Sequence, residues 1–153
     1  MQQYRSLLRW FAAVFLGFTL AACAELGLQA NDPIILDSDV LFAFGSAELK
    51  PEGQRQIEQY VPLIKARGQT WVEVVGHTDR IGDRRLNDRL SLERAESVRQ
   101  LLIANGLNPD RVRARGLGSR NPVVECPDQA RQALIDCLAP NRRVVINVRD
   151  DAW

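Results

Sequence analysis

The stretch from Gly76 to Leu102 constrains this chain most, because it places a charged side chain where apolar ones are expected. It opens with a turn that carries Asp79 and continues in a helical pattern. A guanidinium stays charged at physiological pH, and burying one without a partner is costly. Arg94 therefore requires an anion, and Asp79 is the nearest candidate before the helix. On a helical wheel centred on Asn87, Arg94 lies within about 60° of the centre, as do Leu90, Ser91, Val98, Leu101 and Leu102.

Asp79 and Arg94 can be related in two ways. They can form a structural salt bridge that ties the turn to its own helix. Alternatively, both can face a shared cavity and bind a zwitterion, with the ammonium group on Asp79 and the carboxylate on Arg94. Their spacing alone does not separate these two arrangements.

The complete motif is more specific than this pair. It reads Gly-His-Thr-Asp-x-x-Gly-x-x-x-x-Asn-x-x-Leu-Ser-x-x-Arg-Ala-x-x-Val-x-x-x-Leu from Gly76. It resembles the OmpA C-terminal-like family, which includes the peptidoglycan-binding domains of outer-membrane proteins and of peptidoglycan-associated lipoproteins. The resemblance runs from about Val40 to Val148. Its other matching segments are Leu41–Leu49, Gly116–Gly118, Asn121–Val123 and Ala139–Val144.

The resemblance implies a non-enzymatic protein, without a cofactor, that binds diaminopimelate in the stem peptides of peptidoglycan. The matched aspartate and arginine are Asp79 and Arg94, and the resemblance adds Thr78, Asn87 and Arg142 as supporting residues. Lysine-type stems lack the terminal carboxylate, so they would leave Arg94 unpaired.

The expected rim of the site has two further features, a glycine in its first loop and a pair of arginines before the last strand. Many family members carry an acidic or bulkier residue where this chain has Gly45, so we expect a more open rim there. Arg142 or Arg143, at the start of the last strand, can add a second cation to the site. The alternative for both arginines is a solvated strand end.

The N-terminus resembles a bacterial lipoprotein leader. Arg5 and Arg9 precede an apolar run, Trp10–Leu20, that is too short to span a bilayer. Leu20-Ala21-Ala22-Cys23 then resembles a lipobox, which predicts cleavage before Cys23 and acylation of that residue. A plain secretory signal that leaves Cys23 as a free thiol is the alternative.

These features predict three parts: a signal peptide (1–22), an acylated cysteine with a short tether (23–37), and one folded domain (38–150). Several acyl chains would hold the protein stably on a membrane, at about 0.8 kcal/mol per buried CH₂. The neutral Ala24 favours the outer membrane by resemblance to lipoprotein sorting. We therefore expect a lipid-anchored outer-membrane protein with its domain in the periplasm.

Cys126 and Cys137 lie eleven positions apart in a loop-rich region. Export to an oxidising compartment makes a disulfide between them the default, and some OmpA members carry a bridged loop of this kind. Such a bridge would contribute roughly 3 kcal/mol in the chain-entropy model. Zinc is the weaker alternative, because His77 is the only histidine.

The alternation of elements predicts an α/β two-layer sandwich, βαβαβ(loop)β, with a mixed parallel and antiparallel sheet. Pro62 requires a bend near Gln59 or a helix that restarts at Pro62. Gly106 is expected to end the long helix. The expected strands are 39–44, 71–75, 111–117 and 143–148. Three helices are expected: one that starts at Pro51, one over about 84–105, and a short one within 129–138.

Composition and the remaining polar residues exclude several functions. Without Arg5 and Arg9 the chain has 18 basic and 19 acidic residues, a net charge of −1, so nucleic acid is not an expected partner. His77 follows a buried strand and is expected to be a structural group. No serine has a positioned histidine, and no metal-ligand cluster accompanies His77, so we expect no wall hydrolase. The alternative function is a regulatory lipoprotein whose main partner is another periplasmic envelope protein.

Overall fold

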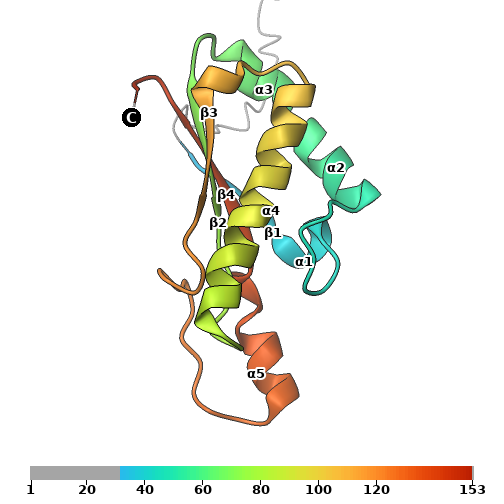
Figure 1. Cartoon of the computed structure of the whole chain (residues 1–153), viewed down its shortest axis with the longest axis vertical. Helices are drawn as coiled ribbons and strands as arrows, with labels where there is room; N and C mark the ends of the chain where they lie inside the picture. The colour runs from blue at the N-terminus through green and yellow to red at the C-terminus, as the bar shows by residue number, and fades with distance from the viewer. Residues whose placement is uncertain (1–31, 153) are drawn as a thin grey trace, which may run out of the picture.

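The computed structural model describes residues 32–152, which form a four-stranded sheet with helices on one face (Figure 1). The strand order is β1-β4-β2-β3, in which β2 and β3 are parallel and the other neighbours are antiparallel. The predicted mixed α/β sandwich is confirmed. The elements are β1 (Ile34–Asp37), α1 (Ser38–Leu41), α2 (Pro51–Glu58), α3 (Val61–Ala66), β2 (Trp71–Gly76), α4 (Arg84–Ala104), β3 (Val112–Gly116), α5 (Arg131–Cys137) and β4 (Arg143–Arg149), with 3₁₀ turns at Pro109–Arg111 and Ala139–Asn141.

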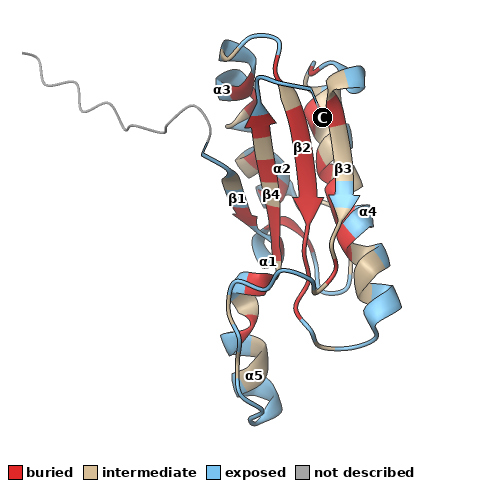
Figure 2. Cartoon of the chain, turned by 90° about the vertical axis from the view of Figure 1, so that its left-hand side faces the viewer, coloured by how far each residue is buried: buried red, intermediate tan, exposed pale blue. Residues whose placement is uncertain are grey.

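The core lies between the sheet and the helices α2, α3 and α4. Alternate residues of each strand point into it, as the period of two requires, and the central strands are buried along most of their length (Figure 2). In β4 the predicted inner face of Val144, Ile146 and Val148 is confirmed. The largest fully buried side chains of the core include Leu36, Leu41, Phe42, Ile57, Ile64, Leu102 and Ile146.

The N-terminal part of the domain corrects two predictions. The first strand is Ile34–Asp37, not 39–44, so the predicted tether (23–37) extended too far into the chain. Asp37 accepts a hydrogen bond from the backbone N–H of Asp39 at 2.7 Å and so starts the helical turn α1. The apolar run after Asp39 fits a strand and a buried turn equally well, and packing against the core selected the turn. Residues 1–31, with the predicted leader and Cys23, lie outside the described residues.

The helices follow the predicted breaks. Pro62 lies in the first turn of α3, a separate helix that begins after α2 ends. Of the two expected outcomes, a bend or a restart at Pro62, the structure shows the restart. Helix α4 ends at Ala104, and Gly106 follows with a φ of +90°. Four of its buried residues, Ser91, Arg94, Val98 and Leu102, lie on the predicted stripe, and the fifth, Ala95, lies just beside it. No helix within residues 32–152 is long and apolar enough to cross a membrane.

The glycines of the motif allow α4 to lie directly on the sheet. A Cβ atom on Gly76 would overlap the backbone carbonyl of Ser91, and one on Gly116 would lie 2.5 Å from the backbone nitrogen of Leu92. The Ser91 hydroxyl donates to the carbonyl of Asp88 and accepts from the N–H of Gly118, each at 2.9 Å. This close approach brings the start of α4 to the carboxyl end of β2.

The loop between β3 and β4 is closed by the predicted disulfide. Cys126 and Cys137 are bonded, with their Cα atoms 6.2 Å apart. Helix α5 lies inside this loop and projects beyond the end of the sheet (Figure 1). Arg80 ties the loop to the turn after β2, because it donates to the Cys126 carbonyl at 3.2 Å and pairs with Asp128.

Candidate functional site

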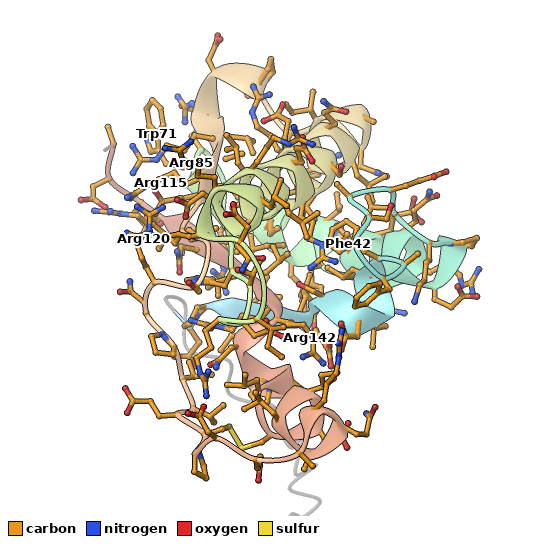
Figure 3. All side chains as sticks on the ribbon, turned by 60° about the horizontal axis from the view of Figure 1, so that its bottom comes forward. Phe42, Trp71, Arg85, Arg115, Arg120 and Arg142 are labelled. Carbon is orange, nitrogen blue, oxygen red and sulfur yellow. A yellow bond between two sulfur atoms is a disulfide. The ribbon has the colours of Figure 1, made fainter. Side chains whose placement is uncertain are left out.

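The predicted site residues line one cavity of about 510 Å³ at the end of the sheet where β2 leads into α4. In this class of fold, ligands collect beyond the carboxyl ends of parallel strands, and Thr78 and Asp79 follow β2 directly. Figure 3 looks at this end of the molecule, with Arg142 between the ribbons of α1 and α5. The predicted residues that line the cavity are Thr78, Asp79, Asn87, Arg94 and Arg142.

Arg94 is buried, and no carboxylate within residues 32–152 forms an ion pair with it. Its side chain is 4% exposed, its Nε donates to the carbonyl of Ser46 at 2.9 Å, and its guanidinium lies 5.1 Å from the ring centre of Phe42. Burial lowers the pKa of Arg94, although the guanidinium remains charged. Its two terminal nitrogens make no hydrogen bond to residues 32–152, so they are available to an anion in the cavity.

Asp79 does not form a salt bridge with Arg94, which was the first of the two arrangements considered above. Its Oδ1 accepts from the N–H of Ile81 at 2.9 Å, and its Oδ2 accepts from Nη1 of Arg142 at 2.9 Å. Each carboxylate oxygen has a second lone pair, so Asp79 can still accept from a ligand ammonium group. The aspartate and the arginine therefore face the same cavity without neutralising each other.

Arg142 lines the cavity as a second cation, but it is paired with carboxylates and is not the solvated strand end considered above. It donates to both carboxylate oxygens of Asp39, with its Nη2 2.7 Å from Oδ2, and its Nη1 donates to Asp79 and to the Ile135 carbonyl. The bonds to Asp39 and Asp79 raise the pKa of Arg142 above its usual range. Arg143 points elsewhere, to the carbonyls of Asn121 and Asn141.

The other two predicted supporting residues, Asn87 and Thr78, differ in their hydrogen bonding. Asn87 uses its Nδ2 to hold the turn, because it donates to the carbonyls of Asp79 and Ile81 at 3.3 Å and 3.0 Å. The Thr78 hydroxyl is buried and has no hydrogen-bond partner within the described part of the chain. Since an unsatisfied buried hydroxyl is unfavourable, Thr78 is a candidate contact for a ligand.

Sequence reasoning missed several residues that line the same cavity. Asp39 reaches it from α1, although 103 positions separate it from Arg142. Phe42 forms its floor under Arg94. Gly45 lies on the rim, and a Cβ there would have no neighbour within 4 Å, which agrees with the expected open rim. Leu90, from the predicted stripe of α4, and Phe44, next to Gly45, also line the cavity. The missed residues that carried no local signal are Lys50, Ile81, Arg131 and Ile135.

His77 has the structural position expected of it. It is 5% exposed, and its backbone N–H donates to the Arg143 carbonyl at 2.9 Å. The ring nitrogen Nδ1 has no hydrogen-bond partner within residues 32–152. Burial, with a smaller contribution from the nearby Arg143 charge, lowers the pKa of His77 below its ordinary 6.5. The ring is therefore neutral in the folded protein at neutral pH.

His77 should make folding stability depend on pH. The unfolded chain binds a proton near pH 6.5 and the folded ring only at a lower pH, so the stabilising contribution of the neutral ring is complete above pH 6.5. It is lost as the pH falls toward the folded-state pKa. Denaturant titrations from about pH 8 to about pH 5 should show a steeper loss of unfolding free energy in the wild type than in His77→Gln. Parallel pH profiles for the two proteins would contradict this assignment.

Comparison with known families agrees with the geometry. The sequence profile of the OmpA family matches residues 41–135, which is more than half of the chain. The chain belongs to the OmpA family. Among its relatives, Outer membrane protein A of Klebsiella aerogenes is 48% identical over 119 residues, which cover 74% of this chain and 34% of the relative. For Outer membrane protein A of Citrobacter freundii the identity is 50%, over 74% of this chain and 50% of the relative.

Solved structures of OmpA-like domains have the same fold. The cell wall anchor of the type VI secretion system from Pseudomonas aeruginosa is 29% identical, with a TM-score of 0.66, and the match covers 79% of this chain and 82% of that one. The peptidoglycan-associated lipoprotein from Burkholderia pseudomallei is 26% identical, with a TM-score of 0.61, and the match covers 75% of this chain and 89% of that one. The periplasmic domain of Helicobacter pylori MotB is 25% identical, with a TM-score of 0.66, and the match covers 80% of this chain and 84% of that one.

Membership of the OmpA family confirms the resemblance and the fold class predicted from the sequence. It also agrees with a binding protein and not an enzyme. The chain spans between 34% and 50% of the length of the two curated relatives described above. Similarity to those relatives therefore concerns one domain of each.

Proposed function

We propose that this protein binds the diaminopimelate of peptidoglycan stem peptides without a covalent bond and attaches the outer membrane to the cell wall. One observation carries the proposal: Arg94 is a buried cation that pairs with no carboxylate of the described residues, and it lies in the same cavity as Asp79. The free end of diaminopimelate is an amino acid zwitterion. Its carboxylate would satisfy the terminal nitrogens of Arg94, and its ammonium group would bind Asp79.

The pairing of Asp79 with Arg142 supports this assignment. Arg142 holds the Asp79 carboxylate in place through Oδ2 and is itself held by Asp39. A carboxylate that is oriented before the ligand arrives loses less conformational freedom on binding. The charge-assisted hydrogen bonds to both ends of the zwitterion would then be formed away from bulk water, where they are strongest.

The attachment to the outer membrane rests on the N-terminal sequence. Cys23 would be the acylated residue, and about ten residues separate it from β1, so the domain would remain within roughly 35 Å of the membrane surface. The names of two similar structures, a peptidoglycan-associated lipoprotein and a cell wall anchor, support the same role. Mass spectrometry of the membrane fraction tests the acylation, because a mature chain that begins with an unmodified cysteine would contradict it.

Binding is tested by co-sedimentation of the whole protein, in mild detergent, with purified sacculi. We expect it to sediment with diaminopimelate-type sacculi and to be released by free diaminopimelic acid. Lysine-type sacculi should bind about 10- to 100-fold more weakly, because Arg94 would keep an unsatisfied charge at a cost of about 1–3 kcal/mol. Equal binding to both wall types would contradict the zwitterion assignment. Capture of a protein from an envelope extract, without binding to sacculi, would favour the regulatory alternative.

A further inference from the structure

Helix α5 forms one wall of the ligand cavity, and two of its side chains, Arg131 and Ile135, line it. The position of α5 is fixed from two sides. The disulfide between Cys126 and Cys137 closes the loop that carries it, and the Ile135 carbonyl accepts from Nη1 of Arg142 at 3.1 Å. The same nitrogen of Arg142 binds Asp79, so the α5 wall and the proposed ammonium site share one guanidinium (Figure 3).

The charges that line the cavity do not balance. Arg142 bridges both of the carboxylates there, Asp39 and Asp79. Lys50 donates to the backbone carbonyl of Asp39 and not to its carboxylate. Arg131 forms no hydrogen bond and no ion pair with residues 32–152, and its side chain is exposed at the cavity edge. The cavity therefore has four cations, Lys50, Arg94, Arg131 and Arg142, for two carboxylates.

This excess has a consequence for the ligand. A single amino acid zwitterion is neutral, so binding one would leave the cavity with the same surplus of positive charge. A ligand with a further carboxylate would reduce it. The cavity volume of about 510 Å³ lies within the range of pockets that hold drug-sized ligands, which are larger than one amino acid end.

We propose that Arg131 binds a second carboxylate of the stem peptide, separate from the one on Arg94, and so determines which stem peptides bind best. This inference rests on the proposed function. A guanidinium presents a planar fork of donors that matches a carboxylate. The stem peptide offers two such groups beside diaminopimelate: the α-carboxylate of the preceding D-glutamyl residue and the terminal carboxylate of the following D-alanine. Both have the same chemistry, and amidation removes either charge.

Calorimetric titration of the whole protein with three synthetic stem peptides tests the proposal. One peptide has both carboxylates free, one is amidated at the D-glutamyl residue, and one at the D-alanine terminus. Since Arg131 is exposed, we expect one amidation to weaken wild-type binding by about 3- to 10-fold. Arg131→Gln should weaken binding of the peptide with both carboxylates free by the same factor, so that the free and amidated peptides bind equally well. Arg131→Lys should restore part of the preference for the free peptide.

Arg55→Gln is the matched control, because it removes one exposed positive charge from α2, away from the cavity, and should preserve the discrimination. The inference is overturned if neither amidation affects the wild type, or if the effect persists in Arg131→Gln. A wild type that binds none of the three peptides would instead refute the proposed function. Unchanged circular dichroism and melting temperature in Arg131→Gln would show that α5 remains folded.

Discussion

Replacing Arg94 with glutamine is expected to reduce the affinity for diaminopimelate-type stem peptides by about 100-fold or more, which corresponds to about 2.7 kcal/mol or more. The loss follows from removing the charge proposed to bind the carboxylate at the free end of diaminopimelate. The unfolding free energy should stay within about 1 kcal/mol of the wild type or rise, because the variant no longer buries a guanidinium that lacks a carboxylate partner. Titration calorimetry and denaturant unfolding measure the two effects separately.

Arg94→Lys provides the control for charge. It keeps a cation on α4 but loses the fork that can bind a carboxylate with two parallel hydrogen bonds, so we expect intermediate binding, weakened by about 10-fold. If Arg94→Gln binds as well as the wild type, the carboxylate does not sit on this residue. If it fails to fold, the bond to Ser46 and the contact with Phe42 matter more to stability than the cost of burying the charge.

Replacing Asp79 with asparagine is expected to reduce the same affinity by a similar factor, about 100-fold. The change is nearly isosteric and leaves an oxygen that can accept from the N–H of Ile81. It removes the charge proposed to bind the ligand ammonium group and weakens the half-buried bond to Arg142, which retains Asp39. We therefore expect a moderate loss of stability, about 1–2 kcal/mol, together with a large loss of binding.

Asp128→Asn is the matched control for Asp79→Asn. It also removes the carboxylate of an arginine pair, but Asp128 is exposed, and neither it nor its partner Arg80 lines the ligand cavity. It should change stability by less than about 1 kcal/mol and leave binding unaffected. If both variants retain the wild-type affinity for stem peptides, the ammonium group does not bind at Asp79.

Arg94 and Asp79 differ in how the fold holds them, and this difference affects both predictions. Arg94 reaches the cavity from α4 and pairs with no carboxylate of residues 32–152, whereas Asp79 lies in a turn held by Asn87 and Arg142. Under the proposed function, we therefore expect Arg94 to contribute to binding with little contribution to folding, and Asp79 to contribute to both. A comparison of the two stability changes would detect this difference.

The parts of the fold that were predicted correctly depend on local features. The inward stripe of α4, its end before Gly106 and the restart at Pro62 follow from periodicity, from glycine at positive φ and from the missing N–H of proline. The cysteine pair was predictable from its spacing and from expected export. By contrast, the segment after Asp37 was predicted as a strand and is a helical turn, since an apolar run of that length has no distinct period.

The amino-acid sequence by itself determined that Thr78 and Asp79 follow β2 and that Arg94 is placed on an inward face of the next helix. Only the tertiary structure decided how the charges are paired. It brought Asp39 from the first turn and α5 from the bridged loop to Arg142, so that Arg142 took the carboxylate of Asp79 and Arg94 was left without one. The physical reason is that charges pair according to distance and burial in the folded chain, and a partner 103 positions away leaves no mark in local sequence.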